Sequence, residues 1–367
     1  MKRYSGFLVI FLIITMVLVA GCAKEAPNTE QPTNLPESTA ADKTTDNSAV
    51  KAEYIIKYGS GVAEVTDRPD PDATWAYAFR DYVQEKSGGR IKVDFYFNNQ
   101  LGGQTDLFQG VGSGAIEVAV LNGMTTENFN KNVCLFSSPG LFKSLSEANA
   151  VFDSEWAAKF FDQIRSDNSV IVAGTAATGF RNFTNDDKEI KVPADAKGLL
   201  LRVMESPVSM KMVESIGASP IPIDWGEVYT ALQNGVADGQ ENVLSGVIAN
   251  KVYEVQHYMV LDKHMVSSLW GMVSQKWLDT LPEDLQTVVL DGMRAGAEAS
   301  RAMLDKYNED ALDFLRENGV KIYEPTAEEM ELWQTAYRTL PYDYIRTQVE
   351  DPKYVDELFA LLESLDK

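Results

Sequence analysis

No part of the chain says more about its architecture than residues 225–242, which read Trp225-Gly226-Glu227-Val228-Tyr229-Thr230-Ala231-Leu232-Gln233-Asn234-Gly235-Val236-Ala237-Asp238-Gly239-Gln240-Glu241-Asn242. Asp224 and Glu227 stand three residues apart, which is the spacing of a capping box, so we expect a helix to begin there. Asn234-Gly235 has the composition of a helix end, and the residues from Val236 to Asn242 are expected to form a strand. A helix followed directly by a strand favours an α/β fold.

The alternation of strands and helices extends on both sides of this stretch. We expect strands at residues 54–58, 91–97, 117–121, 170–174, 199–203, 221–223 and 320–323. We expect helices at residues 72–87, 105–111, 146–167, 206–216 and 282–318, followed by a helical tail interrupted at Pro341. The pattern is typical of an α/β protein with helices on both sheet faces. The 367 residues, 45% of them hydrophobic, are enough for two such domains.

The composition argues against several classes of protein. The chain has 33 Lys and Arg against 54 Asp and Glu, a net charge of −21, which repels nucleic acid. Two cysteines, Cys22 and Cys134, are too few for a disulfide framework or a C-x-x-C metal site. We expect His257 and His264 to be packed or solvated, and Cys134 to be an inert core thiol. Phosphate-binding, nucleophile-elbow and zinc-protease motifs are missing, so we predict no metal, no cofactor and no catalytic residue.

The N-terminus has the pattern of an export signal. Met1-Lys2-Arg3 precedes an apolar or small stretch at residues 7–20, which as a helix is about 21 Å long and too short for a bilayer core of about 30 Å. A transmembrane anchor is therefore the less favoured alternative. Leu18-Val19-Ala20-Gly21-Cys22 resembles a bacterial lipobox, so we expect residues 1–21 to be a signal peptide and Cys22 to be lipidated. Residues 22–52 contain almost no large apolar side chain and are expected to form a flexible tether.

Two arginines fall where an α/β sheet opens its ligand crevice, near strand ends. Arg181 lies in Gly179-Phe180-Arg181-Asn182-Phe183, and Arg202 ends the strand expected at residues 199–203. A guanidinium can hold a carboxylate through two parallel hydrogen bonds. The alternative is that each arginine pairs with a neighbouring Asp or Glu on the surface of this acidic chain. From the residues alone, the surface pair is the favoured interpretation.

Several motifs together resemble the DctP-type solute-binding proteins of tripartite ATP-independent periplasmic (TRAP) transporters. The longest is the stretch at residues 225–242 quoted above, and the others are Gly198-Leu199-Leu200-Leu201-Arg202-Val203, Ile216-Gly217-Ala218-Ser219-Pro220, Ser87-Gly88-Gly89-Arg90-Ile91-Lys92-Val93, Gln100-Leu101-Gly102-Gly103 and Val252-Tyr253-Glu254-Val255-Gln256. The resemblance implies a two-domain α/β fold of the periplasmic-binding-protein type (type II-like), with a ligand cleft between the domains and a long helix that spans both.

The resemblance also implies a function and a set of site residues. Such a receptor captures a small organic acid outside the cytoplasm and delivers it to a membrane permease driven by an ion gradient. The family's carboxylate clamp corresponds to Arg202, its second arginine to Arg181 and its carboxylate-binding asparagine to Asn242, while Trp225 matches a position that supplies an aromatic wall. A sensor for a signalling partner is the alternative function, and a secreted enzyme acting on an organic acid is a weaker one.

The chain departs from the family pattern at positions that bear on the substrate. Gln104 stands where the family often has an acidic residue, and Val243 stands where it often has proline. First-domain ligand contacts are expected at strand ends, namely at Ser60, Asn122 and Thr175. The clamp is compatible with these departures, and the identity of the organic acid stays open.

Domain boundaries follow from where the chain is expected to cross between the two halves. We expect residues 53–178 and 266–308 to form domain I, and residues 179–265 and 309–367 to form domain II. The long helix after Pro282 is expected to span both domains. The chain would then be a receptor anchored by lipid to a membrane outside the cytoplasm.

Overall fold

The computed structural model describes residues 52–64 and 70–365. The expected signal peptide, the expected lipidation site at Cys22 and all but the last residue of the expected tether lie outside the described residues. Among the helices of the described part, none has both the length and the apolar character needed to cross a bilayer.

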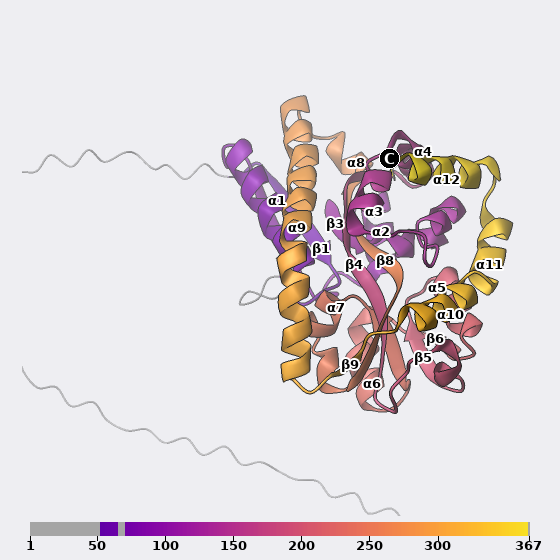
Figure 1. Ribbon diagram of the computed structural model, residues 1–367. Coiled ribbons are helices and arrows are strands. Elements are labelled where there is room, and N and C mark those ends of the chain that lie inside the picture. The colour runs from indigo at the N-terminus through magenta and orange to yellow at the C-terminus, as the bar shows by residue number, and fades with distance from the viewer. Residues whose placement is uncertain (1–51, 65–69, 366–367) are drawn as a thin grey trace, which may run out of the picture. The chain divides into compact units, whose positions relative to one another are not determined.

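The nine strands of the described chain form one mixed sheet in the order β2-β1-β3-β8-β4-β7-β5-β6, with β9 beside β8. Their bounds are β1 Tyr54–Ser60, β2 Ile91–Tyr96, β3 Val118–Asn122, β4 Val170–Asn185, β5 Leu200–Val203, β6 Ser219–Pro222, β7 Gly239–Asn242, β8 Tyr258–Ser274 and β9 Lys321–Tyr323. β1 is parallel to β2 and β3, and β5 is parallel to β6 and β7. β8 is antiparallel to β3 and β4, and β4 is antiparallel to β7. The sheet therefore has a parallel group at each end, joined by two long antiparallel strands (Figure 1).

These two long strands, β4 and β8, are where the sequence-based expectations were incomplete. The strand expected at residues 170–174 continues to Asn185, and no strand was expected at residues 258–274, where β8 lies. The side chains of β8 are buried almost continuously along its length, on both faces of the sheet. A strand covered on both faces shows no alternation of polar and apolar residues, so its pattern carries no period-2 signal.

The helices surround this sheet. Their bounds are α1 Pro71–Lys86, α2 Gln104–Ser113, α3 Leu145–Phe152, α4 Glu155–Asn168, α5 Pro207–Ser215, α6 Val228–Gln233, α7 Leu244–Ala249, α8 Gln275–Leu278, α9 Glu283–Glu317, α10 Ala327–Tyr337, α11 Leu340–Gln348 and α12 Lys353–Leu365. Short 3-10 helices are η1 Gly123–Asn128, η2 Lys131–Leu135, η3 Pro193–Ala196, η4 Trp225–Glu227 and η5 Val252–Glu254.

Two details of the expected helices were wrong. The helix expected at residues 146–167 is two helices, because the Ser154 hydroxyl accepts from the Ala157 N–H and starts α4 anew. The Asp224 carboxylate accepts from the Gly226 N–H, and the Glu227 N–H donates to the Asp224 carbonyl, so no capping box forms there. The helical tail is interrupted at Pro341 as expected: α10 ends at Tyr337, and Pro341 lies in the first turn of α11, where its missing N–H costs no helical hydrogen bond.

The 35-residue helix α9 agrees with the expected long helix after Pro282, and it packs into two separate cores. Its first half contributes Leu285, Val289 and Met293 to a core shared with α1, β1, β2 and β3. Its second half contributes Tyr307, Ala311 and Leu315 to a core shared with α6, α7 and β8. α9 and α10–α12 lie on opposite sides of the sheet, and α10–α12 join a third core with α3, α4 and α5 (Figure 1).

Candidate ligand-binding site

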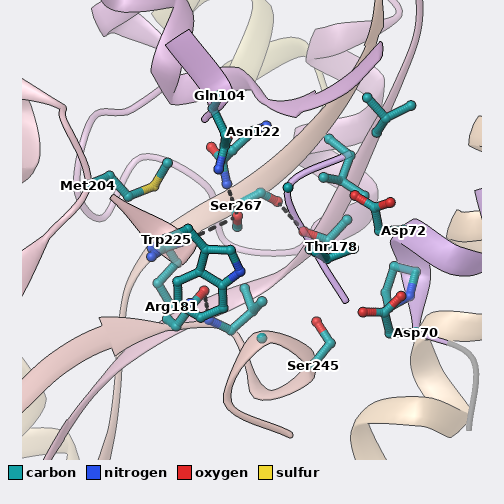
Figure 2. A pocket seen from close by; sticks show the side chains of 18 of the residues that line it. Asp70, Asp72, Gln104, Asn122, Thr178, Arg181, Met204, Trp225, Ser245 and Ser267 are labelled. Atoms are coloured by element: carbon teal, nitrogen blue, oxygen red, sulfur yellow. Dashed lines mark hydrogen bonds between the residues drawn. The ribbon is translucent and has the colours of Figure 1, made fainter. Parts of the chain in front are cut away.

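A cavity of about 80 Å³ lies where the ends of β1, β3, β5 and β7 meet the middle of β4 and β8. That volume holds several water molecules. Five of the seven expected site residues line it: Arg202, Arg181, Asn242, Trp225 and Asn122. Gln104, noted above as a departure from the family pattern, also lines the cavity. Further polar residues of the wall, which sequence reasoning did not nominate, are Asp70, Asp72, Thr178, Ser245 and Ser267 (Figure 2). The wall contains residues from both expected domains.

Arg202, on β5, is a buried cation without a carboxylate partner in the described part of the chain. Only 2% of the residue is exposed, and its Nε donates to the Ile223 carbonyl at 2.9 Å. Its Nη1 has no hydrogen-bond partner among the described residues. The guanidinium carbon lies 5.5 Å from the ring centre of Trp225, within cation–π range. Burial lowers the pKa of Arg202 to about 10. The expectation of a surface ion pair is therefore wrong for Arg202.

Arg181, on β4, has an anionic partner inside the protein. Its Nε donates to Glu241 Oε2, and its Nη2 donates to Glu241 Oε1 at 3.0 Å and to the Glu241 carbonyl at 2.8 Å. Its Nη1 donates to Ser267 Oγ at 3.3 Å. The side chains of Arg181 and Glu241 are only 2% and 1% exposed. Arg181 therefore does pair with an acidic residue, but the pair is buried in the cavity wall instead of lying on the surface.

The Arg181–Glu241 pair belongs to a buried network of charged side chains that sequence reasoning missed. His264 Nε2 lies 3.1 Å from Glu241 Oε2, His264 Nδ1 lies 2.7 Å from Asp262 Oδ2, and the Tyr337 hydroxyl donates to Asp262 Oδ2 at 2.5 Å. Burial alone would lower the pKa of His264, but Asp262 and Glu241 raise it to about 9. Two cations and two carboxylates thus balance to zero net charge.

The same charges fix the ionisation of Glu241. Burial alone would raise its pKa, but Arg181 and His264 outweigh burial and lower the pKa to about 2. The one sequence signal for this network is the spacing of Asp262 and His264, which places both side chains on one face of β8. Their bonding partners come from β7 and α10, so the spacing alone did not reveal the network.

Asn242 and Gln104 have side-chain amides with N–H donors left over. Asn242 Oδ1 accepts from the Val243 N–H at 2.9 Å, and no hydrogen bond of the described residues uses its Nδ2. Gln104 Oε1 accepts from the Asn122 N–H at 2.8 Å and from Thr125 Oγ1 at 3.1 Å, which leaves its Nε2 similarly unused in the described chain. Together with Arg202 these two residues form a wall rich in hydrogen-bond donors, which we call the donor wall.

Asn122, Ser60 and Thr175 are engaged in other contacts. Asn122 Nδ2 donates to Ser267 Oγ at 2.8 Å while its Oδ1 accepts from the Met124 N–H, so the side chain is held in place. Ser60 and Thr175 are not among the residues that line the cavity. Ser60 donates to Asp72 Oδ1 at 2.9 Å, and Thr175 accepts two hydrogen bonds from Arg301 of α9. Both residues therefore support neighbouring elements.

Asp70 and Asp72 bring two carboxylates to the start of α1. Asp70 caps the helix, accepting from the Ala73 N–H at 2.8 Å. The two residues are 3% and 4% exposed. Burial raises the pKa of Asp70 to about 6, and burial together with the Asp70 charge raises the pKa of Asp72. The sequence Asp70-Pro71 is an N-cap followed by proline at the first helical position, a helix-start signal that did not by itself indicate a binding role.

Four hydrogen bonds tie the first part of the chain to the segment around β5. Asn99 Nδ2 donates to Asp224 Oδ1, Thr105 Oγ1 donates to Glu205 Oε2, Asn128 Nδ2 donates to the Glu205 carbonyl, and Ser206 Oγ donates to Glu127 Oε2, all at 2.8–3.0 Å. The two sides of the cavity are thus in direct contact beside it.

Other reactive groups are scarce in the described chain. No group of three or more His, Cys, Asp or Glu side chains in residues 52–64 and 70–365 is arranged to hold a metal ion. Cys134 is buried, and burial followed by the Glu127 charge raises the pKa of its thiol, as expected for an unreactive core cysteine.

The sequence matches the family described as bacterial extracellular solute-binding protein, family 7 (DctP), over residues 62–347. The chain belongs to this DctP family. A solute-binding protein of Verminephrobacter eiseniae is 31% identical over 244 residues, which cover 66% of this chain and 72% of that protein.

Two solved structures show that the DctP fold extends over the described chain. The sugar acid binding protein DctPAm of Advenella mimigardefordensis, in complex with galactonate, is similar with a TM-score of 0.80 and 28% identity over 85% of this chain and 99% of that one. A TRAP periplasmic solute-binding protein of Sulfurospirillum deleyianum, with bound succinate, has a TM-score of 0.79 and 27% identity over 84% and 99% of the two chains.

Proposed function

We propose that this DctP-family protein is a receptor that captures a small organic acid by its carboxylate and delivers it to a TRAP permease for uptake driven by an ion gradient. The observation that carries the proposal is the guanidinium of Arg202, which lines the cavity, is 2% exposed and has an Nη1 without a partner among the described residues. A buried cation without an anion is costly, and a ligand carboxylate would remove that cost.

The donor wall supports the proposal because a carboxylate needs several donors. In the proposed complex the carboxylate accepts from Arg202, and the unused amide groups of Asn242 and Gln104 supply further hydrogen bonds. The Arg202 guanidinium lies over the Trp225 ring, within cation–π range, and this contact helps to hold it in the cavity wall. In this proposal Arg181 has a supporting role, since Glu241 already takes three of its hydrogen bonds.

Relatives of the chain support the ligand class. The similar proteins of Advenella and Sulfurospirillum were solved with galactonate and succinate, and both ligands are carboxylates. The proposal contains no reaction, because the relatives named above are binding proteins. Delivery implies that residues 53–178 and 266–308 close on residues 179–265 and 309–367 around the ligand, by a hinge motion that the bound acid favours.

Substitution of Arg202 tests the clamp. In Arg202→Met we expect affinity for any bound organic acid to fall at least a hundredfold, on the scale of about 3–5 kcal/mol for a broken buried ion pair. Binding would be found first by thermal shift of the full chain in detergent against a panel of organic acids, since a ligand at a hundred times its Kd adds about 2.7 kcal/mol of stability. Calorimetry would then give the affinities.

The matched control is Arg301→Met. Arg301 is also partly buried and also makes an ion pair, with Asp153, but it does not line the cavity. We expect Arg301→Met to bind the ligand like the wild type. Unchanged affinity in Arg202→Met, or an equal loss in both variants, would contradict the clamp.

We also propose that Cys22 carries a lipid that anchors the receptor to a membrane outside the cytoplasm. The support is the lipobox-like run Leu18-Val19-Ala20-Gly21-Cys22 after a short apolar segment. We expect Cys22→Ser to leave the membrane fraction, while Cys134→Ser, which removes a buried thiol elsewhere, stays in it. A Cys22→Ser protein that still sediments with membranes would refute the anchor.

A further inference from the structure

The wall opposite Arg181 and Trp225 is acidic, and the proposed function does not use it. Asp70 and Asp72 lie on one side of the cavity, with Trp225 and Arg181 on the other (Figure 2). Both carboxylates come from the first turn of α1, where Asp70 is the N-cap. We call these two residues the acceptor wall.

The acceptor wall has hydrogen-bonding capacity to spare. Asp70 accepts from the Ala73 N–H at 2.8 Å, and Asp72 accepts from Ser60 Oγ at 2.9 Å. The pKa of Asp70 is about 6, so at neutral pH this side chain is ionised and can only accept. Asp72, whose pKa is raised by burial and by the Asp70 charge, keeps acceptor positions on its carboxyl oxygens whether or not it holds a proton. Neither carboxylate forms a salt bridge with a residue of the described chain. The lone pairs of Asp70, and those left on Asp72, therefore call for a hydrogen-bond donor.

Arg202 does not meet this need. Its Nε donates to the Ile223 carbonyl, and no hydrogen bond or salt bridge of the described residues joins it to Asp70 or Asp72. The unpartnered Nη1 of Arg202 and the two carboxylates therefore line one cavity without satisfying one another. A ligand that reaches both walls has to be an acceptor at one end and a donor at the other.

This polarity discriminates between organic acids. A dicarboxylate held at Arg202 would bring its second carboxylate towards the negative charge of this buried pair of carboxyl groups, and like charges repel strongly where water is excluded. A hydroxyl or ammonium group at the same end would instead donate to a charged acceptor, which is the stronger class of hydrogen bond.

We propose that Asp70 and Asp72 determine the specificity of the receptor, by selecting a monocarboxylate that carries hydrogen-bond donors at its remote end and by rejecting dicarboxylates. The proposal rests on the proposed function, because Arg202 must hold the first carboxylate. It names a class of ligand and leaves hydroxyl and ammonium donors to be distinguished by experiment.

Matched pairs of acids test it, with the full chain in detergent and calorimetry as the measurement. Gluconate and glucarate differ only in a terminal hydroxymethyl group against a carboxylate, as do 4-hydroxybutyrate and succinate, while 4-aminobutyrate presents an ammonium at the same place. We expect the donor-bearing member of at least one set to bind at least tenfold tighter than its dicarboxylate. The hydroxy and amino members then identify which donor is used.

Single variants assign the preference to the acceptor wall. In Asp72→Asn or Asp70→Asn we expect the preference over the dicarboxylate to shrink by roughly ten- to a hundredfold, the scale of a hydrogen bond to a charged group. Asparagine is as good an N-cap as aspartate, so Asp70→Asn keeps α1 intact. Asp81→Asn is the control, because it removes the same charge from an exposed position of the same helix, and it should keep the wild-type preference.

The outcomes separate this proposal from the proposed function. If dicarboxylates bind through Arg202 as tightly as their donor-bearing partners, or if both Asn variants keep the preference, the role of Asp70 and Asp72 is refuted while the carboxylate receptor stands. If no probe binds, or if binding is unaffected by Arg202→Met, both proposals are refuted together.

Discussion

Two arginines in the wall of one cavity are equally buried and have opposite surroundings. Arg181 and Arg202 are each 2% exposed. Arg181 is held by Glu241 within a network that includes His264 and Asp262, whereas Arg202 has a backbone carbonyl, an aromatic ring and an unpartnered Nη1 in the described chain. The first charge is balanced by the protein itself. The second is left for something that the protein binds.

The comparison shows that a buried charge is not necessarily a charge that a ligand can bind. A buried ion that is fully hydrogen-bonded contributes to a rigid wall and is costly to disturb. A buried ion without an anion raises the free energy of the empty protein and is a functional-site candidate for that reason. The same residue type at the same depth can therefore be structural or ligand-binding, and the partners decide which.

The largest expected effect comes from removing the carboxylate that pairs with Arg181. In Glu241→Gln the cations Arg181 and His264 lose their shared carboxylate, and the side chain is 1% exposed, so solvent cannot replace it. We expect the free energy of unfolding to fall by about 3–5 kcal/mol, measured by urea denaturation. Arg202→Met should leave the free energy of unfolding unchanged or raise it, because removing the Arg202 charge leaves no buried carboxylate without its partner. A similar loss of stability in both variants would contradict the view that Arg181 is paired within the protein and Arg202 is not.

A pH titration sharpens the same contrast. The pKa of His264 is raised from 6.5 in the unfolded chain to about 9, so its contribution to stability is complete below 6.5 and is lost as the pH rises through 9. We expect the free energy of unfolding to fall across that window by up to about 3 kcal/mol, at 1.36 kcal/mol per unit. His264→Gln should be less stable below pH 6.5 and should flatten the slope. An identical slope in wild type and variant would contradict the assignment.

The smallest expected effect lies at the far end of the network. Tyr337 of α10 donates its hydroxyl to Asp262 Oδ2 at 2.5 Å. Tyr337→Phe keeps the ring and removes that donor, so we expect a loss of roughly 1.5–3 kcal/mol, typical of a hydrogen bond to a charged group. Tyr342→Phe is the control, since its hydroxyl donates to the neutral Pro139 carbonyl. An equal or larger loss in Tyr342→Phe would show that the charge of Asp262 does not matter.

Elements with local signals could be predicted from the sequence, and those without could not. The Ser206-Pro207 start of α5 and the long run of α9 after Pro282 follow from capping residues and periodicity. β8 has neither, because both its faces are buried and its limits depend on pairing with β3, β4 and β9. The break between α3 and α4 depends on a single serine inside an otherwise helical pattern.

Some residues of the candidate site could likewise be predicted from the sequence, and others could not. Arg202 and Asn242 were nominated from motifs at strand ends, and the structure brings both to the cavity wall. The acceptor wall was missed because acidic residues are common at the start of a helix, where they stabilise it, so Asp70 and Asp72 gave no separate sign of ligand binding. Glu241 was missed because its partners Arg181 and His264 lie 60 and 23 residues away, on strands whose order in the sheet no local pattern reveals. The residue limits of the two domains stay a prediction.

The long strands β4 and β8 also set a mechanical limit on the molecule. The expected domain limits place two of the crossings between the halves at residues 178–179 and 265–266, and both places lie inside these two paired strands. Any movement between the halves must then bend a hydrogen-bonded ribbon. The ladder shifts register between Ala177 and Gly179, and Gly179 has a φ of 137°, a conformation that side chains disfavour. A Cβ on that glycine would stand 3.3 Å from Val243 of the cavity wall, so one of the irregular points of the ribbon lies directly beside the cavity.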